Sequence, residues 1–164
     1  RRLARLQPPY HLAISLHAPD DELRNRLVPA NRPVGVQAVV EAADDYFTQT
    51  GRRVTYEYVL LAGENDQPSH AMGLADLLQG RPVLVNLITL NPVPDLPFRG
   101  ASADVVGQFK GILERAGLQV QVRLRKGESI DAACGQLRRH ARAEGSTCEG
   151  SYPPTAPRPT TGVE

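Results

Sequence analysis

Hydrophobic positions along the chain follow two different spacings. Short, nearly continuous apolar runs bounded by turn residues predict strands over about 11–16, 54–61, 83–90 and 120–124. Between them, apolar residues recur every three or four positions, as on one face of a helix. These stretches predict helices over about 20–27, 35–49, 72–78 and 103–116, and a helical stretch that runs through 136 and 142. The polar residues 63–70 predict a loop.

Residues that start and end helices support this division. Asp20 is a plausible N-cap, and Pro29 and Pro33 end the short helix that follows it. Gly51 and Gly117 stand where two further helices should end.

Strand and helix alternate at least three times, which predicts an α/β fold with a parallel sheet covered by helices. The Val-, Ile- and Leu-rich strands favour burial on both faces. The pattern fits both part of a barrel and an open doubly wound sheet. From Gly145 the composition turns to Pro, Thr, Ser and Gly, so we expect a structured region over 1–144 and a disordered tail over 145–164.

Composition narrows the functional classes. The net charge is +1, so any RNA contact must come from local basic clusters. Two such clusters fit either phosphate contact or a solvated rim: Arg123, Arg125 and Lys126, then Arg138, Arg139 and Arg142. The absence of tryptophan argues against a base-stacking platform. No apolar run approaches the length of a membrane span, and we expect a cytoplasmic protein.

Polar residues at the ends of two strands are candidate ligand contacts, because parallel α/β folds bind ligands there. Ser15 and His17 should share a strand face and could hold ribose hydroxyls or a carboxylate. Asn91, before Pro92, has an amide that donates and accepts. The alternatives are a serine and histidine satisfied by the next loop, and a turn-forming asparagine. Glu57 could point into a barrel or pair with an arginine across the sheet.

Cys134 lies between small residues, which leave room for a ligand to approach its sulfur. A lone cysteine is most often an inert, buried residue, but the nearby Arg125 and Lys126 would favour a reactive thiolate. Cys148 lies in the expected tail and has no such setting. The histidines and cysteines lack metal-ligand spacing, so we expect no metal site.

Taken together, these motifs resemble the radical-SAM dual-specificity RNA (adenine-C(2)-)-methyltransferases. The resemblance runs from Leu12 to Leu137. It includes Leu-Ala-Ile-Ser-Leu-His-Ala-Pro at 12–19, Val-Asn-Leu-Ile at 85–88 and Asp-Ala-Ala-Cys-Gly-Gln-Leu at 131–137, and the combination of Ser-Leu-His-Ala-Pro with the last segment is specific. It implies the C-terminal half of a radical-SAM partial (β/α)6 barrel, in which the first three strands here are the fourth, fifth and sixth.

The same resemblance implies the site and the reaction. Ser15, Leu16 through its backbone, His17 and Asn91 would bind S-adenosylmethionine, and Cys134 would become methylated on sulfur. A second S-adenosylmethionine, cleaved reductively at a [4Fe-4S] cluster, would give a 5′-deoxyadenosyl radical that takes a hydrogen atom from this S-methyl group. The resulting carbon radical would add to carbon 2 of an adenine in 23S rRNA and tRNA. We expect a monomer that takes electrons from a donor such as a flavodoxin.

The cluster motif Cys-x-x-x-Cys-x-x-Cys, the Gly-Glu motif and the resolving cysteine of that family are missing from this chain. Because the chain opens at Arg1 and its one methionine is Met72, we expect a fragment whose missing part lies upstream. One alternative is an inactive remnant or split-gene subunit that binds a partner through an open strand edge. Another, a hydrolase-like enzyme that uses Cys134, lacks a local base and an oxyanion motif.

Overall fold

A four-stranded parallel sheet forms the centre of the computed structural model, which describes residues 2–6, 9–91 and 96–123. Its strands are β1 (Ala13–Ser15), β2 (Val54–Leu60), β3 (Val83–Thr89) and β4 (Gln119–Arg123). They lie side by side in chain order, and each pairs in parallel with the next. All four predicted strands are confirmed, although β1 is shorter than its apolar run.

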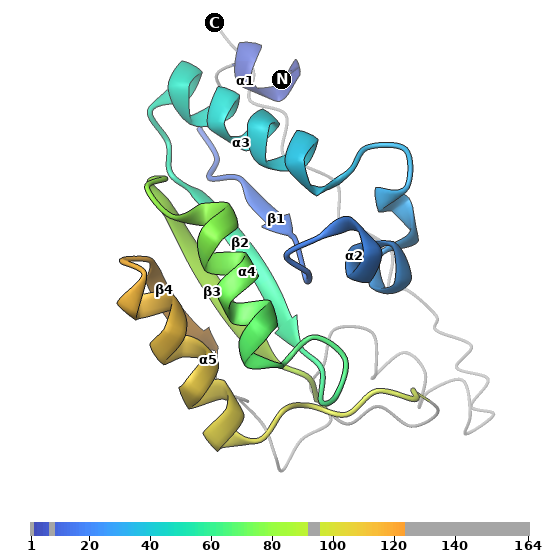
Figure 1. Ribbon diagram of the computed structural model, residues 1–164. Helices are drawn as coiled ribbons and strands as arrows, with labels where there is room; N and C mark the ends of the chain where they lie inside the picture. The colour runs from blue at the N-terminus through green and yellow to red at the C-terminus, as the bar shows by residue number, and fades with distance from the viewer. Residues whose placement is uncertain (1, 7–8, 92–95, 124–164) are drawn as a thin grey trace, which may run out of the picture. The chain divides into compact units, whose positions relative to one another are not determined.

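Helices connect the strands in the predicted order (Figure 1). They are α1 (Arg2–Arg5), α2 (Asp21–Leu27), the 3-10 turn η1 (Pro29–Asn31), α3 (Val36–Thr50), α4 (Pro68–Leu78) and α5 (Ala103–Arg115). The N-cap prediction for Asp20 is confirmed, since its carboxylate accepts the Leu23 N–H at 2.9 Å. Gly51 ends α3 in the left-handed conformation, with φ of 65°. The short helix α1 was not predicted.

The helix α4 begins within the predicted loop, so the prediction of a loop up to residue 70 was wrong. Pro68 occupies the first turn, where its missing N–H costs nothing. Gln67 and His70 form a reciprocal capping box, which satisfies N–H groups at the start of the helix. A polar segment can thus encode a helix start rather than a loop.

Figure 1 shows α3, α4 and α5 on the same face of the sheet. Right-handed crossovers place successive helices on one face whenever the strands advance in one direction. This is the geometry of a barrel wall, whereas a doubly wound sheet reverses direction and carries helices on both faces. Of the two architectures that the sequence left open, the structure has the barrel-type arrangement and not the doubly wound sheet.

Burial follows from this one-sided covering. Along β2, Val54, Tyr56, Tyr58 and Leu60 face the helices and are buried, while the residues between them are half-buried. Ser15 is exposed on the opposite, helix-free face. Among the described elements the helices cover one face only, yet the second face is partly buried along β2, and Asn86 of β3 is buried there.

Two further predictions lie outside the described residues: the helical stretch through 142 and the boundary at 144/145. None of the helices in the described ranges is long and apolar enough to cross a membrane.

Candidate functional site

The end of β1 has an unusual backbone. His17 has φ of 63°, the only positive value at a non-glycine residue within the described ranges. For a residue with a side chain this conformation costs about 1–2 kcal/mol, so its surroundings must stabilise it. The Nδ1 atom accepts the Val59 N–H at 3.1 Å, and the carbonyl oxygen accepts the Asn65 side-chain amide at 2.9 Å. The imidazole thus replaces the next backbone rung of the β1–β2 ladder.

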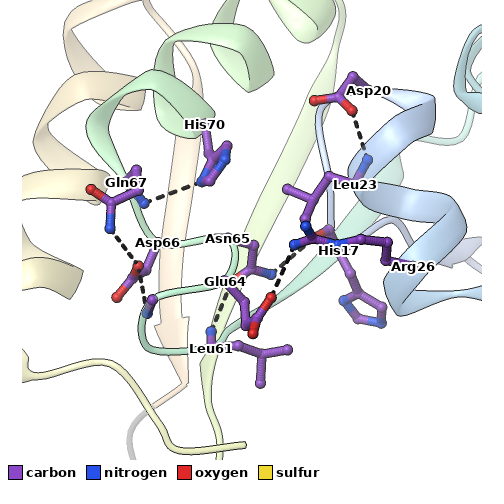
Figure 2. Close-up of polar contacts among 11 residues, drawn as sticks. His17, Asp20, Leu23, Arg26, Leu61, Glu64, Asn65, Asp66, Gln67 and His70 are labelled. Atoms are coloured by element: carbon purple, nitrogen blue, oxygen red, sulfur yellow. Dashed lines mark hydrogen bonds and ion pairs between the residues drawn. The ribbon is translucent and has the colours of Figure 1, made fainter.

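Asn65 ties the turn after β2 to this strand end, as Figure 2 shows. Its side chain is completely buried, and its amide also donates to the Val59 carbonyl at 2.8 Å. Its Oδ1 accepts the Leu61 N–H at 2.7 Å, and its backbone carbonyl accepts the Tyr58 hydroxyl at 2.9 Å. Nothing in its polar sequence context distinguished Asn65 from an ordinary loop residue, so the sequence analysis missed it.

The contacts of His17 also determine its protonation. Burial lowers the pKa of His17, the charge of Arg24 lowers it further, and Glu57 acts in the opposite direction. A neutral imidazole whose Nδ1 accepts a hydrogen bond carries its proton on Nε2. The Nε2–H is therefore the group that His17 can offer to a ligand.

Arg24, in α2, holds the backbone of the preceding residues. Its buried guanidinium donates from Nε to the Leu16 carbonyl at 2.9 Å and from Nη2 to the Ser15 carbonyl at 3.0 Å. Its Nη1 donates to Asn31 Oδ1. Arginine presents donors in a rigid fork, which suits it to fixing two successive carbonyls. No pattern in the sequence distinguishes Arg24 from the other charged residues of α2.

A second layer supports Arg24 from η1 and α3. Asp21 Oδ1 accepts the Asn31 side-chain amide and the Val36 N–H, both at 2.7 Å. These two hydrogen bonds, and then the charge of Arg24, lower the pKa of Asp21. The carboxylate thereby caps α3, whose own N-cap residue is Gly35 and offers no side chain.

The predicted cofactor-binding residues differ in what they can offer. Ser15 is exposed, whereas the Leu16 side chain is fully buried. The Leu16 N–H donates to the Glu57 carbonyl at 3.0 Å and its carbonyl accepts from Arg24. Only the second lone pair of that carbonyl is left for a ligand. The Leu16 backbone can therefore accept one hydrogen bond from a ligand and can donate none.

Asn91 is half-buried and follows the end of β3 by two residues. Because β1, β2 and β3 are neighbours, Ser15, His17 and Asn91 lie at the same edge of the sheet. Two strand spacings separate β1 from β3 by about 10 Å. Cys134 lies outside the described residues.

Glu57 hydrogen-bonds across the sheet to an asparagine. The Asn86 side-chain amide donates to Glu57 Oε1 at 3.1 Å, from the neighbouring strand β3. Within the described ranges no group of three or more His, Cys, Asp or Glu side chains could hold a metal ion.

Comparisons with known proteins agree with this architecture. No protein-family model matches the chain. The probable dual-specificity RNA methyltransferase RlmN of Rhodopirellula baltica is 54% identical over 139 residues, which are 85% of this chain and 38% of that protein. The protein of the same name from Pelotomaculum thermopropionicum is 54% identical over 140 residues, again 85% and 38% of the two chains.

Two solved structures are also similar. A radical SAM methyltransferase from Sphaerobacter thermophilus is 47% identical with a TM-score of 0.76, over 82% of this chain and 40% of that one. A domain of a pyruvate-formate lyase-activating enzyme from Bacteroides vulgatus shares the fold at 18% identity and a TM-score of 0.54, over 76% of this chain and 74% of that one.

The chain spans about two fifths of the length of the curated relatives that it matches. Identity near one half over most of the chain, together with the shared parallel sheet, establishes common descent. The chain is therefore homologous to one part of the probable dual-specificity RNA methyltransferases and of the radical SAM methyltransferase that it matches.

Proposed function

We propose that this chain is the C-terminal part of a radical-SAM enzyme that methylates carbon 2 of an adenine in 23S rRNA and tRNA. The observation that carries the proposal is the arrangement at His17. The backbone of His17 is strained, and its Nδ1 already accepts the Val59 N–H. Its Nε2–H is therefore the donor that remains available at the carboxyl edge of the sheet. Backbone strain of this kind clusters at ligand-binding and active sites.

The residues at this edge fit S-adenosylmethionine, which supplies the methyl groups and a reducible sulfonium when bound. We propose that the Ser15 hydroxyl, the His17 Nε2–H and the Asn91 amide bind its polar groups, with the remaining Leu16 carbonyl lone pair as a minor acceptor. The [4Fe-4S] cluster does not fit this chain, because a chain with two cysteines lacks the three-cysteine motif. In the proposal its ligands belong to the rest of the enzyme.

We assign Cys134 as the residue that carries the methyl group on its sulfur. Carbon 2 of adenine is electron-poor, so an ordinary electrophilic methyl donor would not react there. A positioned sulfur that holds the carbon beside the base removes the entropic cost of bringing the two together. The proposal includes a structured region over 1–144, a monomeric enzyme in the cytoplasm and a reductant such as a flavodoxin.

The test uses an enzyme that contains this chain together with the cluster-binding part of the family. Cys134→Ala should reduce methylation of an RNA substrate to background, while the iron–sulfur absorbance stays unchanged. Cys148→Ala is the matched control and should retain full activity. Undiminished methyl transfer by Cys134→Ala would remove the proposed role.

A second candidate is an inactive remnant or partner subunit, favoured by the missing cluster motif. The DNA upstream of the Arg1 codon discriminates between the two. An in-frame Cys-x-x-x-Cys-x-x-Cys supports the enzyme. A stop codon with no such motif nearby supports the remnant.

A further inference from the structure

A row of polar side chains crosses the helix-free face of the sheet at one level. Ser15 pairs in register with Glu57, Glu57 with Asn86, and Asn86 with Gln121, so the row takes one residue from each strand. Neighbouring strands lie about 4.8 Å apart, which makes these side chains direct neighbours. An aligned polar row is unusual in a sheet whose other residues are mainly Val, Ile, Leu and Tyr.

The two central members of the row carry unsatisfied acceptors. The Asn86 side chain is only 9% exposed, and its amide donates to Glu57 Oε1 at 3.1 Å. Within the described residues, Asn86 Oδ1 and Glu57 Oε2 are both buried and have no hydrogen-bond partner. Buried polar atoms are nearly always paired, because leaving one unpaired forfeits its hydration. An amide oxygen and a carboxylate oxygen are both acceptors, so the groups that would complete them are hydrogen-bond donors.

We propose that Glu57 and Asn86 form a binding subsite for the donor groups of an adenosine, its exocyclic amino group or its ribose hydroxyls. Ser15 flanks the pair in the same row, and His17 follows on the same chain with an available Nε2–H. Glu57 thus lies beside the residues that we assign to the cofactor.

The inference rests on the proposed function, which brings an adenosine to this face twice, in the cofactor and in the RNA. The experiment measures binding by this chain and involves no methyl transfer. The role of Cys134 can therefore fail while the subsite stands, and the reverse also holds.

The 164-residue chain is titrated with S-adenosylhomocysteine and with adenosine 5′-monophosphate, and binding is followed by the NMR signals of its amide groups. The Asn86 side-chain amide should shift with at least one probe. Glu57→Gln keeps the shape but replaces one acceptor with a donor, and it should weaken that binding about tenfold or more. Glu41→Gln makes the same chemical change on the exposed side of α3 and should bind as the wild type does.

The two probes show whether the bound adenosine belongs to the cofactor or to the RNA. Weaker binding of S-adenosylhomocysteine alone places the cofactor's adenosine in the subsite, and weaker binding of the monophosphate alone places the RNA adenosine there. Purine riboside, which lacks the amino group, and 2′,3′-dideoxyadenosine, which lacks the hydroxyls, then identify the donor. If neither probe shifts Asn86, or if Glu57→Gln binds both within a factor of two of the wild type, the subsite is overturned.

Urea unfolding distinguishes binding from a structural role. The new amide of Glu57→Gln can donate to the unpaired Asn86 Oδ1, so the unfolding midpoint should stay the same or rise. A fall in the midpoint with unchanged affinity would mean that the pair serves the fold, and would overturn the proposal.

Discussion

The backbone conformation of residue 17 favours a different amino acid from the one that its side-chain contacts require. The left-handed conformation favours glycine or asparagine, yet only an imidazole accepts from Val59 with one nitrogen and offers N–H with the other. The residue is held there by the buried Asn65. Strain that the surroundings must stabilise is frequent at functional sites.

Replacing His17 with asparagine keeps the backbone conformation but removes the Nε2–H donor. Asparagine adopts positive φ readily and its Oδ1 can accept the Val59 N–H, so His17→Asn should change the free energy of unfolding by less than about 1 kcal/mol. The variant lacks the Nε2–H, so its affinity for S-adenosylhomocysteine should fall about tenfold. Unchanged affinity by calorimetry would exclude His17 from the site.

The lowered pKa of His17 predicts a pH dependence of stability. Between the lowered folded pKa and the ordinary value of 6.5, the unfolded chain binds the proton more readily than the native protein does. The contribution of His17 is therefore complete above pH 6.5 and is lost as the pH falls through the folded pKa. In urea unfolding at a series of pH values, the wild type should lose more stability than His17→Asn on acidification. Parallel curves would contradict the buried, neutral imidazole.

Arg24 and Arg26 lie two residues apart in α2 and should differ sharply in importance. Arg24→Ala leaves the Ser15 and Leu16 carbonyls and Asn31 without their buried donor, which should cost about 3 kcal/mol of unfolding free energy. Arg26 makes an exposed ion pair with Glu64 at 3.0 Å, and Arg26→Ala should cost less than about 0.5 kcal/mol. Chemical denaturation measures both, and equal losses would contradict the anchoring role of Arg24.

Sequence patterns could place candidate residues at one edge of the sheet but not show how they are held. Strand-end position was enough to select Ser15 and Asn91. The shared face expected for Ser15 and His17 assumed an extended backbone, and the chain leaves the strand at His17. Asn65 reaches His17 across 48 residues, and the hydrogen bonds of Arg24 bring together backbone and side-chain atoms of separate elements. Local periodicity carries no information about such contacts.

At the scale of elements, β2 places two tyrosines on one face in different polar environments. The Tyr58 hydroxyl donates to the Asn65 carbonyl, and its ring packs on Phe109 with centroids 5.2 Å apart. The Tyr56 hydroxyl is buried without a hydrogen-bond partner among the described residues. Burial raises the pKa of both phenols, so both remain protonated.

Removing the hydroxyl should therefore lower the free energy of unfolding at Tyr58 but not at Tyr56. Tyr58→Phe removes a buried hydrogen bond and should cost about 1 kcal/mol of unfolding free energy. Tyr56→Phe removes only an unsatisfied hydroxyl and should be neutral or slightly stabilising. Thermal unfolding of the two variants tests this, and a larger loss for Tyr56→Phe would contradict the assigned contacts.

The elements with strong periodicity were predicted well, and those set by local capping were not. Helix α3 follows its apolar spacing and ends at the predicted Gly51. Helix α4 extends into a segment without apolar periodicity, because Pro68 and the Gln67–His70 capping box start it. A helix cap depends on one or two side chains, and a pattern of hydrophobicity averaged over many residues does not detect it.

On the scale of the whole molecule, the two central strands should be the most stable part. Strands β2 and β3 pair on both sides, whereas β1 and β4 each pair on one side within the described sheet. Amide hydrogen exchange should thus be slowest in β2 and β3 and faster in β1 and β4. Mass spectrometry of peptides from each strand measures this, and equal protection of β1 and β2 would contradict the assigned edge.

The order of the strands has a consequence for synthesis. Since every strand pairs with the one made just before it, each newly emerged strand and helix meets a partner that has already left the ribosome. Each pairing bridges a single crossover connection, so the sheet can grow by one strand and one helix at a time. Growth of the sheet can then keep pace with translation, without waiting for the far end of the polypeptide.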